Sequence, residues 1–513
     1  MPKGETIMTL ATVYTRAALG IQAPEVRIEA HIGNGLPGFT LVGLPETAVR
    51  EAKDRVRCAM LNSGFQFPPK RITLNLAPAD LPKEGGRYDL PMALALLLAS
   101  EQLAPRVSVG DYEFIGELAL SGDLRSVQGA LPAALSAARA KRTLIAPSDN
   151  AAELGLLAAP RPPVAPSLLA VCAFLSGQAS LETAPAGKMT SDCAGAGDMA
   201  DIIGQAQARR ALEIAAAGGH NLLLIGPPGT GKTMLACRLP GLLPPMTPDE
   251  ALEQAAISSL AYPGTMPPRY GMRPFRAPHH SASMAALIGG GPLPKPGEIS
   301  LAHHGVLFLD ELAEFDRRTL DALREPLESG VVHLSRARIK VSFPARVQLV
   351  AAMNPSSGGH ADGRDRRAAP QQVLRYLSRL SGPLLDRFDL SIDVPPLSPG
   401  LLARQRADGE DSATLRRRVC AARARQYARG GRLNAHLEGA ARDRDCRLAP
   451  DDALYLEQAL TRLALSVRAW HRLLKVARTL ADLEGCDDIA RRHLAEALSY
   501  RAMDRLLLSL QRG

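Results

Sequence analysis

Long apolar runs are missing from this 513-residue sequence, which argues against a membrane-spanning helix. A bilayer span needs about 20 apolar residues, whereas the best candidate, residues 90–99, is only half as long and contains Pro91. The beginning of the chain lacks a continuous apolar segment followed by a small-residue cleavage site, so no secretory signal is expected. We therefore expect a cytoplasmic protein without a membrane partner.

Paired cysteines and aromatic residues are also scarce. The seven cysteines stand singly, without CxxC spacing, which predicts reduced thiols and no thiolate metal site. Aromatic residues make up 4% of the sequence, too few for extensive stacking on nucleic-acid bases. The net charge of +9 permits an anionic partner without requiring one.

Length and hydrophobic patterning divide the chain into three packing units. Apolar runs alternate with helical patterns in residues 1–178, which predicts a mixed α/β domain in which Asp89 caps a helix. Small, flexible residues without periodicity follow in 179–201, as in an interdomain linker. A second α/β block spans 202–395, and the Arg-rich residues 396–513 are predicted to form a helical lid.

The strongest motif is GPPGTGKT, which follows the apolar strand NLLLI and precedes the helical segment KTMLACRL. This context is typical of a phosphate-binding loop. The loop consists of Gly226, Pro227, Pro228, Gly229, Thr230, Gly231, Lys232 and Thr233. Its glycines let N–H groups turn toward a polyphosphate, Lys232 can neutralise the β and γ phosphates, and Thr233 can ligate Mg²⁺. A glycine-rich turn that only caps a helix is the alternative; the complete pattern favours ATP binding.

Two further strands end in polar residues that suit nucleotide hydrolysis. GVLFLDEL contains Asp310, which could hold the Mg²⁺ hydration shell, and Glu311, which could polarise the attacking water. VQLVAAMN ends at Asn354, whose amide could orient that water or touch the γ-phosphate. Taken alone, such carboxylates more often cap a helix and Asn-Pro more often forms a turn. The upstream phosphate-binding loop favours the catalytic roles.

Two arginines are candidates for contact with the nucleotide. Arg387 in LLDRFDL could be presented to the γ-phosphate of a neighbouring subunit. Asp386 and Asp389 flank it, so a local ion pair is the alternative. Arg468 in LSVRAW could reach the same nucleotide from the helical region. Sequence alone leaves both roles open.

Together these residues resemble an AAA+ ATPase of the magnesium-chelatase-like group, specifically the ComM/YifB family. The resemblance extends over nearly the whole chain and is most specific in stretches such as PKEGGRYDLPMALAL, RPFRAPHHSASMAALIGGGPLPKPGE and RLSGPLLDRFDL. It implies a Lon-protease-like (ribosomal S5 domain 2-like) N-terminal domain, an AAA+ P-loop NTPase core and a C-terminal helical lid. On matching positions, residues 226–233 become Walker A, Asp310 and Glu311 Walker B, Asn354 sensor 1, Arg387 the arginine finger and Arg468 sensor 2.

The sequence departs from these patterns in two places. Arg87 stands where a Lon-like protease carries its nucleophilic Ser, and Leu131 falls about where its Lys would lie, so the N-terminal domain is expected to be proteolytically inactive. Many family members carry a cysteine-rich insert after the sensor 1 Asn, whereas this chain has Ser356 and Ser357. Any metal clip there is therefore absent.

Basic residues near the expected pore of an AAA+ ring are candidate DNA contacts. In HLSRARIKV, Arg336, Arg338 and Lys340 alternate, which on one strand would place them on one face. A charged edge strand that discourages aggregation is the alternative. Lys295, in GGGPLPKPGE, lies in a second segment expected beside the pore, with an ordinary surface loop as its alternative.

Two histidine pairs, His279–His280 and His303–His304, raise the question of a metal. No carboxylate or cysteine stands at ligand spacing in the sequence, so we expect local hydrogen bonds instead.

Function follows from the resemblance in two ways. The family implies a hexameric, ATP- and Mg²⁺-dependent DNA translocase or helicase that promotes branch migration of recombination intermediates during natural transformation. The alternative is a protein-remodelling ATPase like the magnesium-chelatase motor subunit, acting on a protein partner. An ATP-dependent protease is disfavoured by Arg87 and Leu131.

Overall fold

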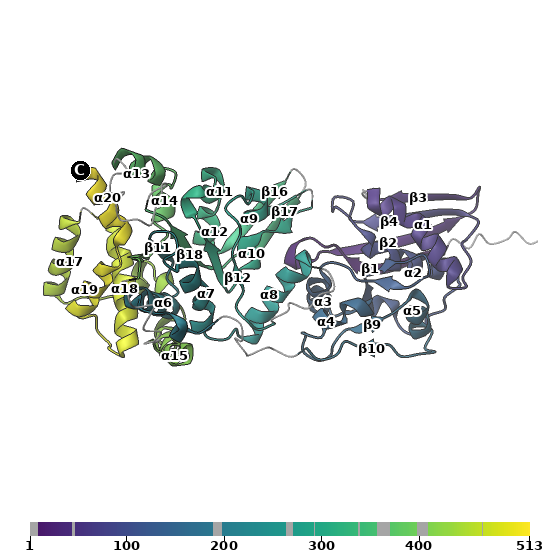
Figure 1. Ribbon diagram of the computed structural model, residues 1–513. Coiled ribbons are helices and arrows are strands. Elements are labelled where there is room, and N and C mark those ends of the chain that lie inside the picture. The colour runs from purple at the N-terminus through teal and green to yellow at the C-terminus, as the bar shows by residue number, and fades with distance from the viewer. Residues whose placement is uncertain are drawn as a thin grey trace, which may run out of the picture.

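A computed structural model gives the fold as an elongated molecule with an α/β domain at one end, a second α/β unit in the middle and helices at the other end (Figure 1). The structure describes residues 9–43, 47–187, 197–262, 270–291, 293–336, 339–355, 370–397, 409–463 and 465–512. No helix in these ranges is long and apolar enough to cross a membrane, and the six cysteines within them are free thiols.

The N-terminal domain is built on a mixed sheet with strand order β10-β9-β8-β5-β1-β2-β4-β3. Its strands are β1 (Thr9–Arg16), β2 (Glu25–Gly33), β3 (Gly38–Val42), β4 (Arg71–Ala77), β5 (Tyr112–Phe114), β8 (Thr143–Pro147), β9 (Pro163–Ala165) and β10 (Glu182–Thr183). Every second residue of β2 and β4 is buried, as in strands with one face on a core. The mixed α/β prediction for this region is confirmed.

Helices cover this sheet and carry most of its apolar side chains. They are α1 (Thr47–Asn62), α2 (Asp89–Ala99), α3 (Ala130–Arg139), α4 (Ala151–Leu154) and α5 (Leu168–Leu175), with a short ribbon of β6 (Glu117–Leu118) and β7 (Leu124–Arg125). The expected capping role of Asp89 is wrong. Asp89 is the first residue of α2, and its buried carboxylate accepts hydrogen bonds from Arg55 at 2.7 and 3.1 Å. Burying a carboxylate without a charged partner is costly, so the side chain pairs with Arg55 and does not cap the helix.

The central unit contains a five-stranded sheet of order β12-β15-β18-β11-β19, paired in parallel throughout. Its strands are β11 (Leu222–Ile225), β12 (Phe275–Arg276), β15 (Val306–Leu309), β18 (Gln348–Met353) and β19 (Leu390–Asp393). All residues of β11, β15 and β18 are buried, as expected for parallel strands covered on both faces. The three strands predicted before the nucleotide motifs are therefore confirmed, and their carboxyl ends lie at one edge.

Helices and two small ribbons surround this sheet. The helices are α6 (Ala206–Gly218), α7 (Lys232–Leu242), α8 (Pro248–Ala261), α9 (Met284–Ile288), α10 (Glu298–Leu301), α11 (Arg317–Ala322), α12 (Arg324–Ser329), α13 (Pro370–Leu377) and α14 (Gly382–Leu385). The ribbons are β13 (Gly289–Gly290) with β14 (Lys295–Pro296), and β16 (Val331–Arg336) with β17 (Ile339–Pro344).

The C-terminal region is helical, as predicted, and packs against the central unit. It comprises α15 (Ser412–Gly430), α16 (Gly439–Asp445), α17 (Pro450–Arg462), α18 (Val467–Glu484), α19 (Arg491–Ser499) and α20 (Ala502–Arg512). Apolar residues of α15 and α18 share one buried cluster with α6, β11 and β18. A movement of these helices would therefore change the packing against the central sheet.

Helix α8 joins the two α/β units, and Figure 1 shows it reaching from the central unit to α3. Leu131 of α3 is buried against Ala251 and Ala255 of α8, and the Gly129 N–H donates to the Ser259 carbonyl at 2.9 Å. Parts of the 179–201 segment also pack onto the units beside it. β10 pairs with β9 through backbone hydrogen bonds, and Met199 is buried among the apolar side chains of the central core.

Candidate active site

The phosphate-binding motif forms the loop between β11 and α7. Gly226 packs so closely that a Cβ would lie 2.2 Å from the Val394 carbonyl oxygen, and Gly229 and Gly231 have φ values of 76° and 87°. Such positions favour glycine. Helix α7 begins at Lys232, so its free N–H groups and its dipole face the loop. The arrangement suits a polyphosphate.

Lys232 lies at the centre of this loop. Its ammonium donates to the carbonyls of Gly226 and Pro227 at 2.7 and 2.8 Å and to Asn354 Oδ1 at 3.1 Å. Burial lowers the pKa of Lys232, while the charges of Asp310 and Glu311 act in the opposite direction. The contact with Asn354 links the phosphate-binding loop to the end of β18, the strand paired with β11.

Thr233 and Asp310 provide oxygen ligands at the same edge of the sheet. The Thr233 hydroxyl donates to Asp310 Oδ2 at 2.7 Å, although 77 residues separate them. A hydroxyl and a carboxylate are the hard oxygen donors that Mg²⁺ prefers. These two residues therefore fit a magnesium ion bound together with a nucleotide.

Glu311 has an unusual backbone, with φ of 51°, a conformation that costs a non-glycine residue about 1–2 kcal/mol. Its side chain is half-exposed and lies 3.3 Å from Nδ1 of His280. His280 follows β12, the strand beside β15, and its ring centroid lies 4.1 Å from that of His279, with the two rings tilted by 34°. Sequence spacing did not reveal this contact, and the only signal was the His279–His280 pair itself.

Replacing His280 with alanine should slow ATP hydrolysis about tenfold, because the Glu311 carboxylate loses the contact that fixes its orientation. Nucleotide affinity should stay unchanged, since His280 has no contact with the phosphate loop. Steady-state kinetics would measure a fall in kcat at constant KM. In a Glu311→Gln background the same change should have no further effect; an additive loss would contradict this role.

Arg387 and Arg468 have acidic partners from other elements. Arg387 forms an ion pair with Glu328 of α12 and not with the flanking Asp386 or Asp389, which the sequence offered as the alternative to a role at the nucleotide. Asp386 instead contacts Arg468 at 3.3 Å and Arg472 at 2.9 Å, because the fold turns its side chain toward α18. Within the described chain, neither arginine contacts residues 226–233.

The basic segment before β18 is a hairpin and not a single strand. Arg336 ends β16, Lys340 lies in β17, and Arg338 falls outside the described residues. Cross-strand pairing places exposed Lys340 beside Ser335, on the face that carries His333 and Ser342. The expected placement of the three cations on one strand is therefore wrong, because Arg336 and Lys340 lie on two paired antiparallel strands. Lys295 is exposed in β14.

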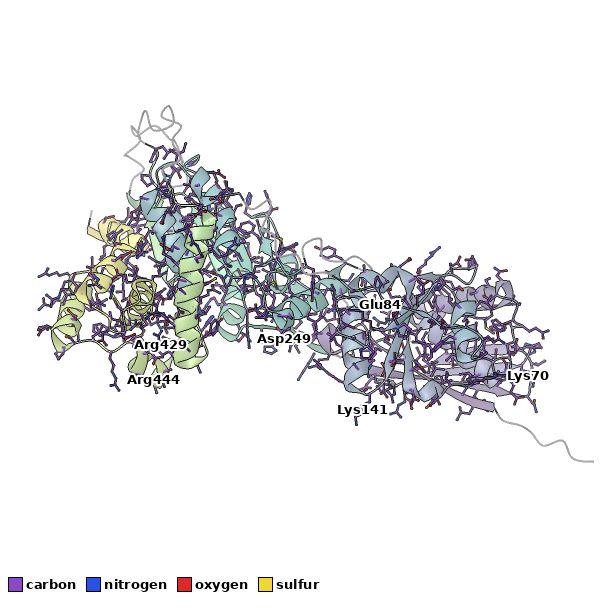
Figure 2. The ribbon with its side chains drawn as sticks, turned by 90° about the horizontal axis from the view of Figure 1, so that it is seen from below. Lys70, Glu84, Lys141, Asp249, Arg429 and Arg444 are labelled. Carbon is purple, nitrogen blue, oxygen red and sulfur yellow. The ribbon has the colours of Figure 1, made fainter. Side chains whose placement is uncertain are left out.

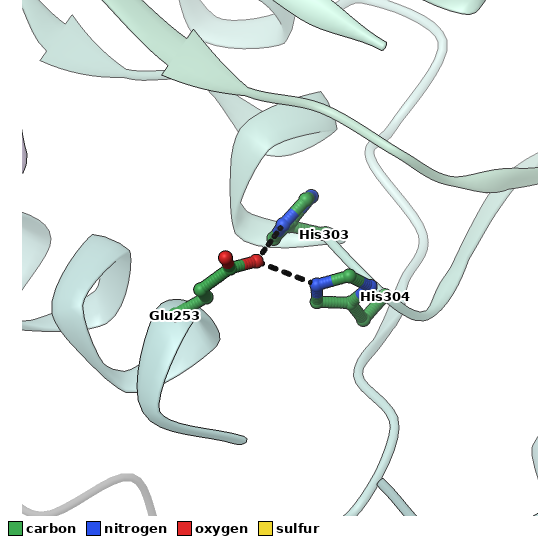
Figure 3. A group of neighbouring side chains, drawn as sticks. All are labelled: Glu253, His303 and His304. Atoms are coloured by element: carbon green, nitrogen blue, oxygen red, sulfur yellow. Dashed lines mark hydrogen bonds and ion pairs between the residues drawn. The ribbon is translucent and has the colours of Figure 1, made fainter. Parts of the chain in front are cut away.

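Glu253 of α8 meets both His303 and His304, as Figure 3 shows. Its Oε2 lies 3.2 Å from His303 Nε2 and 2.8 Å from His304 Nε2. Sequence spacing indicated no carboxylate near this pair, because Glu253 lies 50 residues before His303 in the sequence. The fold brings the two together.

A metal does not fit this cluster as it stands. Burial lowers the pKa of His303 to about 4, so its ring is neutral near pH 7. Its Nδ1 accepts the Arg346 N–H at 3.0 Å, which leaves the proton on Nε2. A metal needs the lone pair of that nitrogen. The cluster instead ties α8 to the chain entering β15.

Two residues that the resemblance places at the dyad positions of a Lon-like protease, Arg87 and Leu131, lie where the two α/β units meet. Arg87 is buried and donates from Nη1 to the Gln128 carbonyl at 2.9 Å, and Leu131 is buried against α8. Neither side chain can supply a nucleophile or a general base.

Comparisons with known proteins cover all three regions. Residues 198–401 match the family described as magnesium chelatase, subunit ChlI, residues 28–150 match subunit ChlI of Mg-chelatase, and residues 409–501 match its C-terminal family. The chain is 61% identical to YifB of Salmonella typhimurium, with 98% of this chain and 99% of that protein covered. It is 57% identical to the competence protein ComM of Haemophilus influenzae, with the same coverage of each chain.

The chain belongs to the ComM/YifB family of magnesium-chelatase-like proteins. A more distant relative is the 38 kDa magnesium-chelatase subunit of Cereibacter sphaeroides, 27% identical over 58% of this chain and 90% of that protein. Membership places the central unit among magnesium-chelatase-like AAA+ proteins, a group that suggests ATPase activity with a nucleotide and Mg²⁺.

Proposed function

We propose that this ComM/YifB-family protein is a homohexameric, ATP-driven DNA translocase or helicase that promotes branch migration of recombination intermediates in natural transformation. The convergence of Lys232, Thr233, Asp310 and Asn354 at one sheet edge carries the ATPase part of the proposal. The competence part is supported by 57% identity to ComM over nearly the full length.

In the proposed hydrolysis, the loop N–H groups and Lys232 bind the phosphates, and Thr233 and Asp310 would hold Mg²⁺. The bound Mg²⁺ would neutralise part of the phosphate charge. Glu311 accepts a proton from the attacking water, and Asn354 orients that water. Lys232 already contacts Asn354 at 3.1 Å, so nucleotide binding would break this bond and free the amide for its new role.

The site is completed by a second subunit in this proposal. Arg387 acts as the arginine finger for a neighbouring nucleotide, and Arg468 as sensor 2. Asp386 pairs with Arg468 of helix α18, and the next residue is Arg387, which pairs with Glu328. A change in the contacts of Arg387 would therefore be transmitted to α18 through Asp386. We assign residues 1–178 to an inactive Lon-like domain, 179–201 to a linker, 202–395 to the AAA+ core and 396–513 to a lid.

DNA is proposed to contact the β16–β17 hairpin and β14. Removing the charges of Arg336, Arg338 and Lys340 together should weaken binding of single-stranded DNA and reduce the dependence of log Kd on log salt by up to about one unit per lost phosphate contact. Fluorescence anisotropy across a salt series would measure both. Basal ATP hydrolysis should persist; an unchanged salt slope would contradict the assignment.

The deciding experiment is strand displacement on a labelled three-stranded junction with ATP, with Glu311→Gln as the inactive control. The proposal expects displaced strand with the parent chain and none with the variant. A chain that hydrolyses ATP without displacing any strand would refute it.

The alternative is a magnesium-chelatase-like motor that remodels a protein partner. It is favoured by the matches to chelatase families along the chain. The two functions differ in what stimulates hydrolysis. DNA should raise the ATPase rate of a translocase, whereas stimulation only by a chelatase-type protein partner would favour the alternative.

A further inference from the structure

A cavity of about 580 Å³ lies where the N-terminal domain meets the central unit. One wall comes from the segment at Gly85–Arg87 and the chain at Ser126–Gln128, and the other from the β13–β14 ribbon with Lys295. Figure 2 labels Glu84, another lining residue, within the N-terminal domain. The cavity is thus built by two domains and is separate from the phosphate loop.

Arg87 is the most unusual residue of this cavity. Its side chain is 3% exposed, and only Nη1 has a partner, the Gln128 carbonyl; Nε and Nη2 have no acceptor among the described residues. A buried guanidinium with unmet donors is costly, since each group loses its hydrogen bonds to water. Burial also lowers the pKa of Arg87. The charge of Glu153 acts in the opposite direction. Two donors of Arg87 therefore lack a hydrogen-bond acceptor among the described residues, and an anion would supply one.

Lys295 supplies a second cation from the facing domain. It is exposed and has no hydrogen bond or ion pair within the described chain. Gly290 and Gly291 beside it line the cavity without side chains that would fill it. An anion between Arg87 and Lys295 would contact both domains.

Two carboxylates limit the kind of anion that fits. Glu84 and Glu117 also line the cavity, and Glu117 lies 4.0 Å from Arg125 at its rim. A continuous polyanion such as a DNA strand would meet these like charges. A small ligand with one anionic end avoids them, and its remaining part can donate hydrogen bonds to the carboxylates.

We propose that this cavity binds a small molecule through a phosphate or carboxylate group held between Arg87 of the N-terminal domain and Lys295 of the ATPase core. The ligand would then bridge the domains and stabilise their docking through α8. Because coupling is reciprocal, tighter docking would also raise the affinity for the ligand. Lys295 of β14 is also a proposed DNA contact, so the test is made without DNA.

The test is calorimetric titration of inorganic phosphate and, in a second arm, citrate into the full chain. The chain carries Lys232→Ala, so that the phosphate loop does not compete. At least one probe should bind, and Lys295→Ala should weaken it about tenfold or more, as expected for loss of a charged hydrogen bond. Arg87→Gln should do the same, and the arm that responds identifies the anion.

Lys70→Ala is the matched control, because Lys70 is exposed and lies at the far end of the N-terminal domain (Figure 2). It should leave the affinity unchanged. If Arg87→Gln does not fold, Lys295→Ala decides the result, since its side chain is on the surface. The proposal is overturned if neither probe binds, or if Lys295→Ala binds the probe as tightly as its parent.

Discussion

Lys232→Ala is expected to lower the rate of ATP hydrolysis by about 100- to 1000-fold, the usual loss when one donor to the reacting phosphates is removed. Lys232 is buried in the loop, and its contacts with two loop carbonyls and Asn354 place its ammonium where the β and γ phosphates would lie. The variant should also bind ATP more weakly. Release of phosphate and binding of a fluorescent ATP analogue would measure the two effects.

Lys70→Ala controls for loss of a lysine elsewhere and should hydrolyse ATP as the parent does. Thermal melting would show whether both variants remain folded. Hydrolysis at the parental rate by a folded Lys232→Ala chain would remove the basis of the proposed active site.

Arg387→Ala should reduce hydrolysis about 1000-fold or more, the size of effect that an arginine finger contributes. Within one chain Arg387 contacts Glu328 and not the phosphate loop, which is the arrangement expected if it serves a neighbouring subunit. Mixing Arg387→Ala chains with Lys232→Ala chains should therefore restore part of the activity. In such mixtures some interfaces combine an intact Lys232 with an intact Arg387.

Arg379→Ala is the matched control for this experiment. Arg379 is exposed and pairs with Glu314 at 3.2 Å, so its loss should leave hydrolysis near the parental rate. A mixture that assembles into oligomers yet stays inactive would show that Arg387 does not act between subunits.

The strands and loop that carry the site could be predicted because their signals are local. Four or more consecutive apolar residues in β11, β15 and β18 identify buried parallel strands, and the glycines after β11 meet a backbone requirement visible in the sequence. Parallel strands bring their carboxyl ends to one edge. The proximity of Lys232 to Asn354 and of Thr233 to Asp310 follows from that geometry.

The basic hairpin shows where local patterns mislead. Alternating charges predict one exposed strand face, whereas Arg336 and Lys340 lie on two paired antiparallel strands. Asp89 was misassigned for a related reason. A helix start with an acidic residue resembles a cap, and only packing placed Arg55 beside its buried carboxylate.

The sequence by itself determined which residues form the nucleotide loop and the three strand ends beside it, since backbone geometry and hydrophobic burial act over a few residues. Tertiary structure alone decided which distant side chains became partners: His280 with Glu311, Glu328 with Arg387, and Glu253 with two histidines. It also created the cavity between Arg87 and Lys295, because residues from both α/β units form its walls where the units meet.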